Sequence, residues 1–141
     1  MDTGVTPRVL LVDDMVDAGE LLAMCLSAEG FDVTFAASGA EALRLAADHD
    51  FDVVVLDLAM PEMDGFAVAR ALRDIPRCAT LPIIALTGFG NARDVERTTK
   101  AGFSAHLVKP AGVNQVRDAI AIATHAMHVA RRRAVETTPA D

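Results

Sequence analysis

Residues 53–65 read VVVLDLAMPEMDG. The first four residues are apolar and mostly β-branched, which predicts a strand buried on both faces of a parallel sheet. This strand ends on a carboxylate, Asp57, and the next residues predict a turn in which Asp64 caps the following helix. A carboxylate at the end of a buried strand is costly unless other groups compensate its charge. The stretch therefore predicts a central strand and requires partners for Asp57.

Further strand-like segments alternate with helix-like segments on both sides of this stretch. The expected strands are RVLLVDD (8–14), FDVTFA (31–36), PIIALT (82–87) and AHLVK (105–109). The expected helices occupy residues 15–29, 38–49, 66–74, 91–102 and 113–127. Because short connections join strands and helices in turn, the sequence predicts an α/β fold with one doubly wound parallel sheet between helices.

The helices differ in how firmly apolar residues anchor them to this sheet. In the second helix, Ala40, Leu43 and Ala47 are expected to face inward. The fourth helix has Val95 as its only sizeable apolar residue. We therefore expect the fourth helix to be poorly anchored and locally less stable than the others.

The composition suits one domain with a sizeable core, since 52% of the 141 residues are hydrophobic. We expect an N-terminal lead over residues 1–7, the domain over residues 8–130 and a flexible C-terminal tail over residues 131–141. No internal linker and no second domain are expected.

The net charge of −7 argues against a general affinity for nucleic acid or for an anionic membrane, because both would repel the chain. The N-terminal residues do not resemble a secretory signal, and no run of about 18 apolar residues is free of charge. We therefore expect a cytoplasmic protein that binds neither nucleic acid nor membrane.

Polar residues interrupt the apolar strands at equivalent positions. Asp13 and Asp14 close the first strand, Asp57 the third, Thr87 the fourth and Lys109 the fifth. In an open parallel sheet the carboxyl ends of all strands lie along one edge, where ligands bind. The five side chains are therefore expected to converge on one cleft.

The chemistry of this cleft points to a phosphoryl group. Three carboxylates brought together repel one another, so we expect a cation among them, and oxygen ligands at a shallow site favour Mg²⁺. Lys109 adds a positive charge and Thr87 a hydroxyl donor, which together suit a trianionic ligand. Asp57 lies centrally and can act as the nucleophile that forms an aspartyl phosphate.

In this order and spacing, the segments VDD (12–14), VVVLDLAMPEMDG (53–65), IIALTG (83–88) and LVKP (107–110) resemble the response-regulator receiver domain of two-component signalling. The resemblance covers residues 8–130. It implies a flavodoxin-like (βα)5 fold with strand order 2-1-3-4-5. It also implies that Asp57 accepts a phosphoryl group from a phosphohistidine on a sensor or hybrid histidine kinase, or on a histidine phosphotransfer protein.

The resemblance also implies a set of metal ligands. Asp14 and Asp57 would hold Mg²⁺ directly, Asp13 would act through water, and the backbone carbonyl of Ala59 would complete the protein ligands. Lys109 precedes Pro110 at a position where the family usually has a cis peptide bond.

Other positions implied by the resemblance concern switching and rate. Thr87 is expected to move toward the phosphoryl group, and the position of His106 usually carries Tyr or Phe, which turns inward in response. An imidazole could still switch, or it could sit exposed and leave the switch weak. Ala59 and Phe89 match positions that admit or exclude the hydrolytic water, and we expect Phe89 to shield the acyl phosphate somewhat.

The leading interpretation is a phosphorylatable switch or relay rather than a conventional enzyme, with at most self-catalysed phosphotransfer and dephosphorylation. Output to an unknown downstream protein is expected through the face formed by the fourth helix, fifth strand and fifth helix. GFSAHLVKP (102–110) resembles receivers attached to hybrid histidine kinases, which makes a phosphorelay role equally plausible.

Two alternatives remain open. A Mg²⁺-dependent phosphohydrolase with an aspartyl-phosphate intermediate would need an aspartate at position 59, where this chain has alanine. A receiver-like interaction module that never binds phosphate would not need the complete set of strand-end residues.

Overall fold

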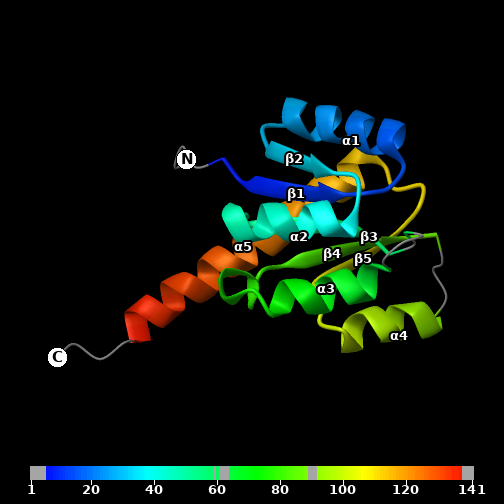
Figure 1. The fold of residues 1–141 in the computed structure, drawn as a ribbon. Coiled ribbons are helices and arrows are strands. Elements are labelled where there is room, and N and C mark those ends of the chain that lie inside the picture. Colours follow the sequence, from blue (N-terminus) through cyan, green and yellow to red (C-terminus); the bar gives the residue numbers. More distant parts are fainter. Residues whose placement is uncertain (1–5, 59, 61–63, 89–91, 138–141) are drawn as a thin grey trace.

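The computed structural model describes residues 6–58, 60, 64–88 and 92–137 (Figure 1). The strands are β1 (Arg8–Val12), β2 (Asp32–Ala36), β3 (Val53–Asp57), β4 (Ile83–Thr87) and β5 (Ala105–Val108). The helices are α1 (Val16–Ala28), α2 (Gly39–Asp48), α3 (Gly65–Arg73), α4 (Ala92–Lys100) and α5 (Val113–Thr137), with a short 3₁₀ helix η1 (Pro76–Cys78) after α3.

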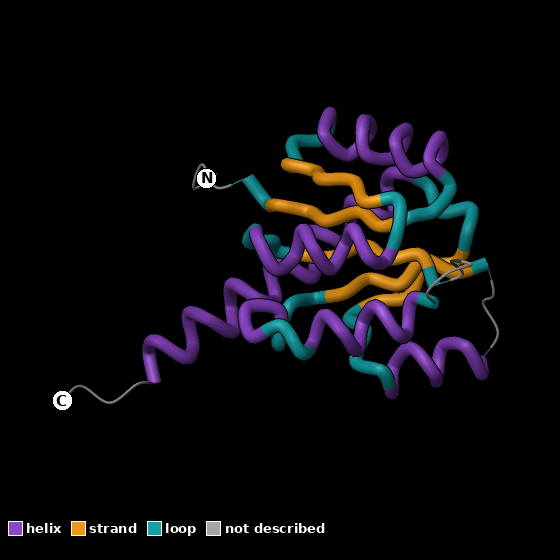
Figure 2. The backbone as a smooth tube through the Cα atoms, in the orientation of Figure 1, coloured by secondary structure: helices purple, strands orange, loops and turns teal. Residues whose placement is uncertain are grey.

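All strand pairs are parallel, and the sheet has the order β2-β1-β3-β4-β5 (Figure 2). Residues of α1 and α5 pack on one face of the sheet, while residues of α2 and α3 pack on the other. Helix α4 lies beside α3 and contacts β5 through a side-chain hydrogen bond. The structure confirms the predicted doubly wound fold and its strand order.

Strand β3 is the centre of the molecule, and every residue from Val53 to Asp57 is buried. Alternate residues of β3 contribute to the two hydrophobic layers, with Val54 in the layer under α2 and α3 and Val55 in the layer under α1 and α5. Strand β3 pairs with β1 on one side and with β4 on the other. The position of Asp57 is therefore fixed by neighbouring strands as well as by both apolar layers.

The inward face of α2 differs from the expectation. Ala42 and Ala46 are fully buried, whereas Ala40 and Ala47 are exposed, and Leu43 packs at the margin of the core. The helix has many alanines, so apolar periodicity alone does not distinguish neighbouring faces. The expected cap is correct, because the Ser38 hydroxyl accepts a hydrogen bond of 3.1 Å from the Glu41 N–H.

Helix α5 continues to Thr137, so residues 131–137 are helical although the sequence pattern assigns them to a flexible tail. The C-terminal part of α5 projects away from the sheet (Figure 1). Within the described ranges, no helix is both long enough and apolar enough to cross a membrane.

The turn after β3 brings backbone segments unusually close together. The Gly65 N–H donates to the Leu58 carbonyl at 3.0 Å, and the Asp64 carboxylate caps α3 by accepting from the Ala67 N–H at 2.9 Å. A Cβ atom at Gly65 would lie 2.6 Å from the Leu58 Cα and 2.9 Å from the Asp57 carbonyl oxygen. Glycine is therefore required at position 65, because the backbone at the end of β3 leaves no room for a Cβ atom there.

Replacing Gly65 by alanine should destabilise the fold, because backbone atoms of β3 would have to shift to admit a methyl group. We expect Gly65→Ala to lower the free energy of unfolding by about 1–3 kcal/mol, as overpacking usually does. Urea denaturation measures this change. Gly88→Ala is the matched control, since a Cβ atom there meets nothing within 4 Å; equal stabilities of the two variants would contradict the close approach at Gly65.

Candidate functional site

The strand-end residues singled out from the sequence lie at one edge of the sheet. Asp13 and Asp14 follow β1, Asp57 and Thr87 are the last residues of β3 and β4, and Lys109 follows β5. Asp13, Asp57 and Thr87 are buried, with exposed fractions of 5%, 2% and 3%. Strand order places β3 between β1 and β4, so Asp57 occupies the centre of the edge.

The carboxylates form a compact cluster. Asp13, Asp14 and Asp57 each offer an oxygen atom, and these atoms all lie within 4.8 Å of one another. The Met15 N–H donates to Asp13 Oδ1 at 2.9 Å, which fixes the orientation of that carboxylate at the start of α1. The predicted convergence of the three acids is present in the structure.

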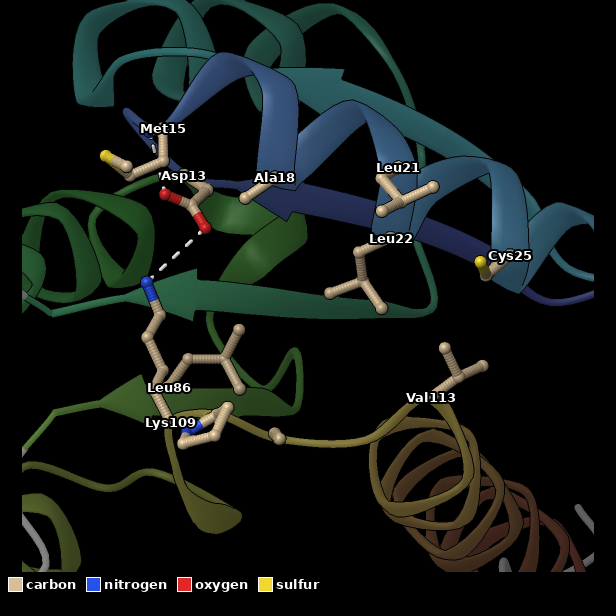
Figure 3. A pocket seen from close by; sticks show the side chains of 11 residues that line it. Asp13, Met15, Ala18, Leu21, Leu22, Cys25, Leu86, Lys109 and Val113 are labelled. Atoms are coloured by element: carbon tan, nitrogen blue, oxygen red, sulfur yellow. Dashed lines mark hydrogen bonds and ion pairs between the residues drawn. The ribbon is translucent and has the colours of Figure 1, made fainter.

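Lys109 is the cation that the described residues supply to this cluster. Its Nζ lies 3.2 Å from Asp57 Oδ2 and 3.4 Å from Asp13 Oδ2, and Figure 3 shows the contact with Asp13. The Lys109 N–H also donates to the Thr87 carbonyl at 2.7 Å, which continues the pairing of β4 and β5. The Lys109–Pro110 peptide bond is cis, as the resemblance implies.

Burial and charge act in opposite directions in this cluster. Burial raises the pKa of Asp13 above its ordinary value of 3.8; the Met15 N–H and Lys109 oppose this rise, and Asp57 adds to it. Burial by itself would lower the pKa of Lys109, but the carboxylates of Asp57 and Asp13 outweigh it and raise that pKa. Lys109 is therefore firmly charged, while the carboxylates still carry more charge than one ammonium compensates.

The donor set fits a hard divalent cation. The cluster offers carboxylate oxygens without imidazole or thiolate ligands, and Asp14 keeps it partly open to solvent. Such a set suits Mg²⁺, which prefers oxygen ligands and retains several waters. Ala59, whose carbonyl is an expected ligand, lies outside the described residues.

A pocket of about 560 Å³ opens beside the charged cluster (Figure 3). Asp13 and Lys109 line one end, and the rest is lined mostly by apolar residues of α1 and of the β5–α5 connection, together with Leu86 of β4 and Val113 of α5. Met15, which precedes α1, and Leu21 and Met24 on α1 are exposed, with exposed fractions of 61%, 62% and 70%. An apolar surface thus adjoins the reactive edge of the sheet.

His106 is half-buried on β5, which does not match the alternative in which its imidazole sits exposed. Its Nδ1 atom lies 3.0 Å from the hydroxyl oxygen of Thr98 on α4, and Thr98 itself is only 2% exposed. Apolar periodicity does not single out Thr98 on α4, because threonine is not an apolar residue. A sequence signal was nevertheless available, because Thr98 lies three residues after Val95 and residues three apart are neighbours on a helix surface.

Phe89, expected to influence the acyl phosphate, lies outside the described residues.

Comparison with known proteins agrees with the fold. The family model of the response regulator receiver domain matches residues 9–121. The transcriptional regulatory protein PrrA of Mycobacterium tuberculosis is 43% identical over 111 residues, which cover 78% of this chain and 47% of PrrA. The chain thus spans about half the length of that relative.

Solved structures give the same result. The chemotaxis protein CheY4 of Vibrio cholerae matches with a TM-score of 0.80 and 29% identity, covering 84% of this chain and 99% of CheY4. The receiver domain of the sensor histidine kinase PA1611 from Pseudomonas aeruginosa matches with a TM-score of 0.78 and 27% identity, covering 86% and 99% of the two chains. In that structure a magnesium ion is coordinated in the active site cleft.

The chain belongs to the response regulator receiver family. Receiver domains are phosphorylatable modules of two-component signalling, and they generally act as phosphoacceptors rather than as conventional enzymes.

Asp13→Asn should stabilise the fold at neutral pH when divalent cations are absent. A carboxyl group whose pKa is raised in the folded state costs stability once it ionises, so the cost grows as the pH rises above 3.8. The variant should therefore unfold at a higher urea concentration than the wild type at about pH 7, and the difference should shrink as the pH falls toward 3.8.

Asp48→Asn at the exposed end of α2 is the matched control. We expect its stability against urea to vary with pH as that of the wild type does. A lower stability of Asp13→Asn at neutral pH would contradict the energetic cost assigned to the ionised Asp13.

Proposed function

We propose that Asp57 accepts a phosphoryl group from a phosphohistidine donor in the presence of Mg²⁺, and that the chain acts as a signalling switch or relay. The contact of Lys109 Nζ with both Asp57 and Asp13 is the observation that carries the proposal. It places a cation beside a buried carboxylate at the open edge of the sheet, where a trianionic group can be neutralised.

In the proposed transfer, an Asp57 carboxylate oxygen forms a bond with phosphorus while the phosphorus–nitrogen bond of the donor histidine breaks. The bonding electrons stay with the imidazole nitrogen, and the acceptor becomes an acyl phosphate. Rigid placement of Asp57 at the end of β3 favours this step, because the nucleophile loses little freedom on reaction. Asp14, Asp57 and the Ala59 carbonyl would hold Mg²⁺ directly, and Asp13 would hold it through water. The bound ion would neutralise negative charge on the transferred phosphoryl group.

Lys109 and Thr87 would stabilise the transferred group. The Lys109 ammonium, which bridges two carboxylates, would pair with a phosphoryl oxygen, and the buried Thr87 hydroxyl would donate to another. Both residues stand at the ends of adjacent strands, and the hydrogen bond from the Lys109 N–H to the Thr87 carbonyl keeps them together. We retain the expectation that Phe89 affects the lifetime of the acyl phosphate.

The donor would approach over the pocket beside the charged cluster. That pocket begins at Asp13 and Lys109 and continues over apolar residues of α1, including Leu21 and Cys25. A helix of a histidine kinase or of a histidine phosphotransfer protein could bury its apolar face there while its phosphohistidine reaches Asp57. The exposed side chains of Met15 and Met24 extend this apolar surface along α1.

Output would pass through α4, β5 and α5 to a downstream protein. Val108 and Ile122 are large apolar residues exposed on β5 and α5, with exposed fractions of 45% and 71%, which suits a protein contact.

The phosphohydrolase alternative is disfavoured because position 59 carries alanine instead of a second acid. An interaction module that never binds phosphate would not need the ammonium of Lys109 between the buried carboxylates of Asp13 and Asp57.

Incubation with acetyl phosphate and Mg²⁺ tests the proposed acceptor. Intact-mass measurement should find one added phosphoryl group on the wild type and none on Asp57→Asn, because the amide is a far weaker nucleophile. Omission of Mg²⁺ should greatly reduce the addition, and mild hydroxylamine should remove it, as expected of an acyl phosphate.

Asp48→Asn, at the exposed end of α2, should be phosphorylated like the wild type. The proposal fails if the wild type gains no phosphoryl group, or if Asp57→Asn gains as much as the wild type does.

A further inference from the structure

Helix α4 is attached to the sheet by a polar side chain. Among residues 96–100, Glu96, Arg97, Thr99 and Lys100 are exposed, whereas Thr98 is buried with an exposed fraction of 2%. Exposed charged side chains make an ion pair within the helix, between Lys100 and Glu96 at 2.9 Å. Thr98 is thus the residue through which this part of α4 faces the protein interior.

The partner of Thr98 is His106, at a distance of 3.0 Å between the Thr98 hydroxyl oxygen and the imidazole Nδ1. This hydrogen bond joins α4 to β5. The other ring nitrogen, Nε2, is buried, and it has no hydrogen-bond partner within the described part of the chain. The imidazole is therefore held at one nitrogen and unsatisfied at the other.

The direction of the hydrogen bond follows from two general preferences. A threonine hydroxyl inside a helix tends to donate to the carbonyl one turn earlier, and its oxygen then accepts from outside the helix. A buried N–H group without a partner is also rarer than a buried acceptor without one. Both preferences assign the proton to Nδ1 of His106, which donates to Thr98 and leaves Nε2 as a buried acceptor.

His106 lies on the same face of the sheet as Thr87. In the pairing of β4 with β5, His106 is opposite Ala85, and Thr87 follows Ala85 by two residues. Paired residues of parallel strands point to the same face, and residues two apart along a strand share that face. Leu86 and Leu107 belong to the opposite layer, under α1 and α5. Thr87 and His106 are thus diagonal neighbours on the face that α4 adjoins.

We propose that Thr98 is the positioning residue for His106: its hydroxyl holds the imidazole as the Nδ1–H tautomer, orients the ring and ties α4 to β5. The inference rests on the proposed function in one respect: His106 has a switching role only if phosphorylation of Asp57 moves Thr87. A change that reaches the His106 ring must then displace α4 as well. Among residues 96–100, the coupling of the reactive edge to α4 thus runs through the hydrogen bond of Thr98.

Nitrogen-15 NMR of the histidine rings tests this assignment at about pH 8.5, which is above the ordinary pKa of histidine. His106→Phe identifies the His106 signals by their disappearance. In the wild type, Nδ1 should show the shift of a protonated ring nitrogen and Nε2 that of an unprotonated one. Protonation at Nε2 instead would overturn the proposal without the need for any Thr98 variant.

Variants of Thr98 test the link to α4. Thr98→Val removes the hydroxyl with little change in shape, and it should shift the His106 signals and accelerate amide exchange in α4 roughly five- to tenfold. Thr98→Ser keeps the hydroxyl and should restore both readouts. Asp48→Asn, at the exposed end of α2, should match the wild type. Unchanged His106 signals in Thr98→Val, or a failure of Thr98→Ser to restore them, would overturn the positioning role.

Intact-mass measurement after acetyl phosphate treatment of the same samples separates this inference from the proposed function. Thr98→Val should still gain a phosphoryl group on Asp57, because Thr98 is not one of the three acids that form the cluster. A wild type that gains none would refute the proposed function, whereas the tautomer of His106 and its dependence on Thr98 are decided by the NMR measurements alone.

Discussion

The ammonium of Lys109 between the carboxylates of Asp13 and Asp57 is the interaction on which the site depends. Without a cation, two nearly buried carboxylates at adjacent strand ends would repel each other and one of them would retain its proton. Lys109 opposes this repulsion, and the pKa of Asp13 is nevertheless raised, chiefly because the carboxyl group is buried. The remaining negative charge gives the cluster its expected affinity for a divalent cation.

The arrangement of this cluster could be predicted from the sequence because it follows from topology. Short apolar strands end on polar residues, and the carboxyl ends of parallel strands share one edge, so Asp57, Thr87 and Lys109 had to meet. The central position of β3 was predictable for the same reason, since a continuous apolar run must be covered on both faces. The distances that make Lys109 a bridge between two carboxylates required the structure.

Other features could not be read from residue patterns. The inward face of α2 depends on its alanines, and Ala42 and Ala46 differ from Ala40 and Ala47 only in their position relative to the sheet. Among residues 96–100 of α4 the buried residue is a threonine, which hydropathy does not distinguish from its exposed neighbours. A polar contact such as that of Thr98 with His106 joins residues from two elements, so neither segment alone predicts it.

The molecule thus combines a rigid centre with a weakly attached edge. Asp57 is held by paired strands and two apolar layers, which suits a nucleophile whose position must not vary. Helix α4 is attached through a hydrogen bond and through side chains such as Arg97, which stacks over Phe66 at 4.4 Å. Polar contacts of this kind open at low free energy, so α4 is well suited to report a change at the centre.

A crystal structure with Mg²⁺ and beryllofluoride, a stable mimic of a phosphoryl group, tests the central claim most directly. We predict beryllofluoride bonded to the Asp57 carboxylate and contacted by Lys109 and Thr87, with Mg²⁺ bound among Asp13, Asp14 and Asp57. Beryllofluoride bound to a different residue, or Mg²⁺ bound away from the three carboxylates, would contradict the account.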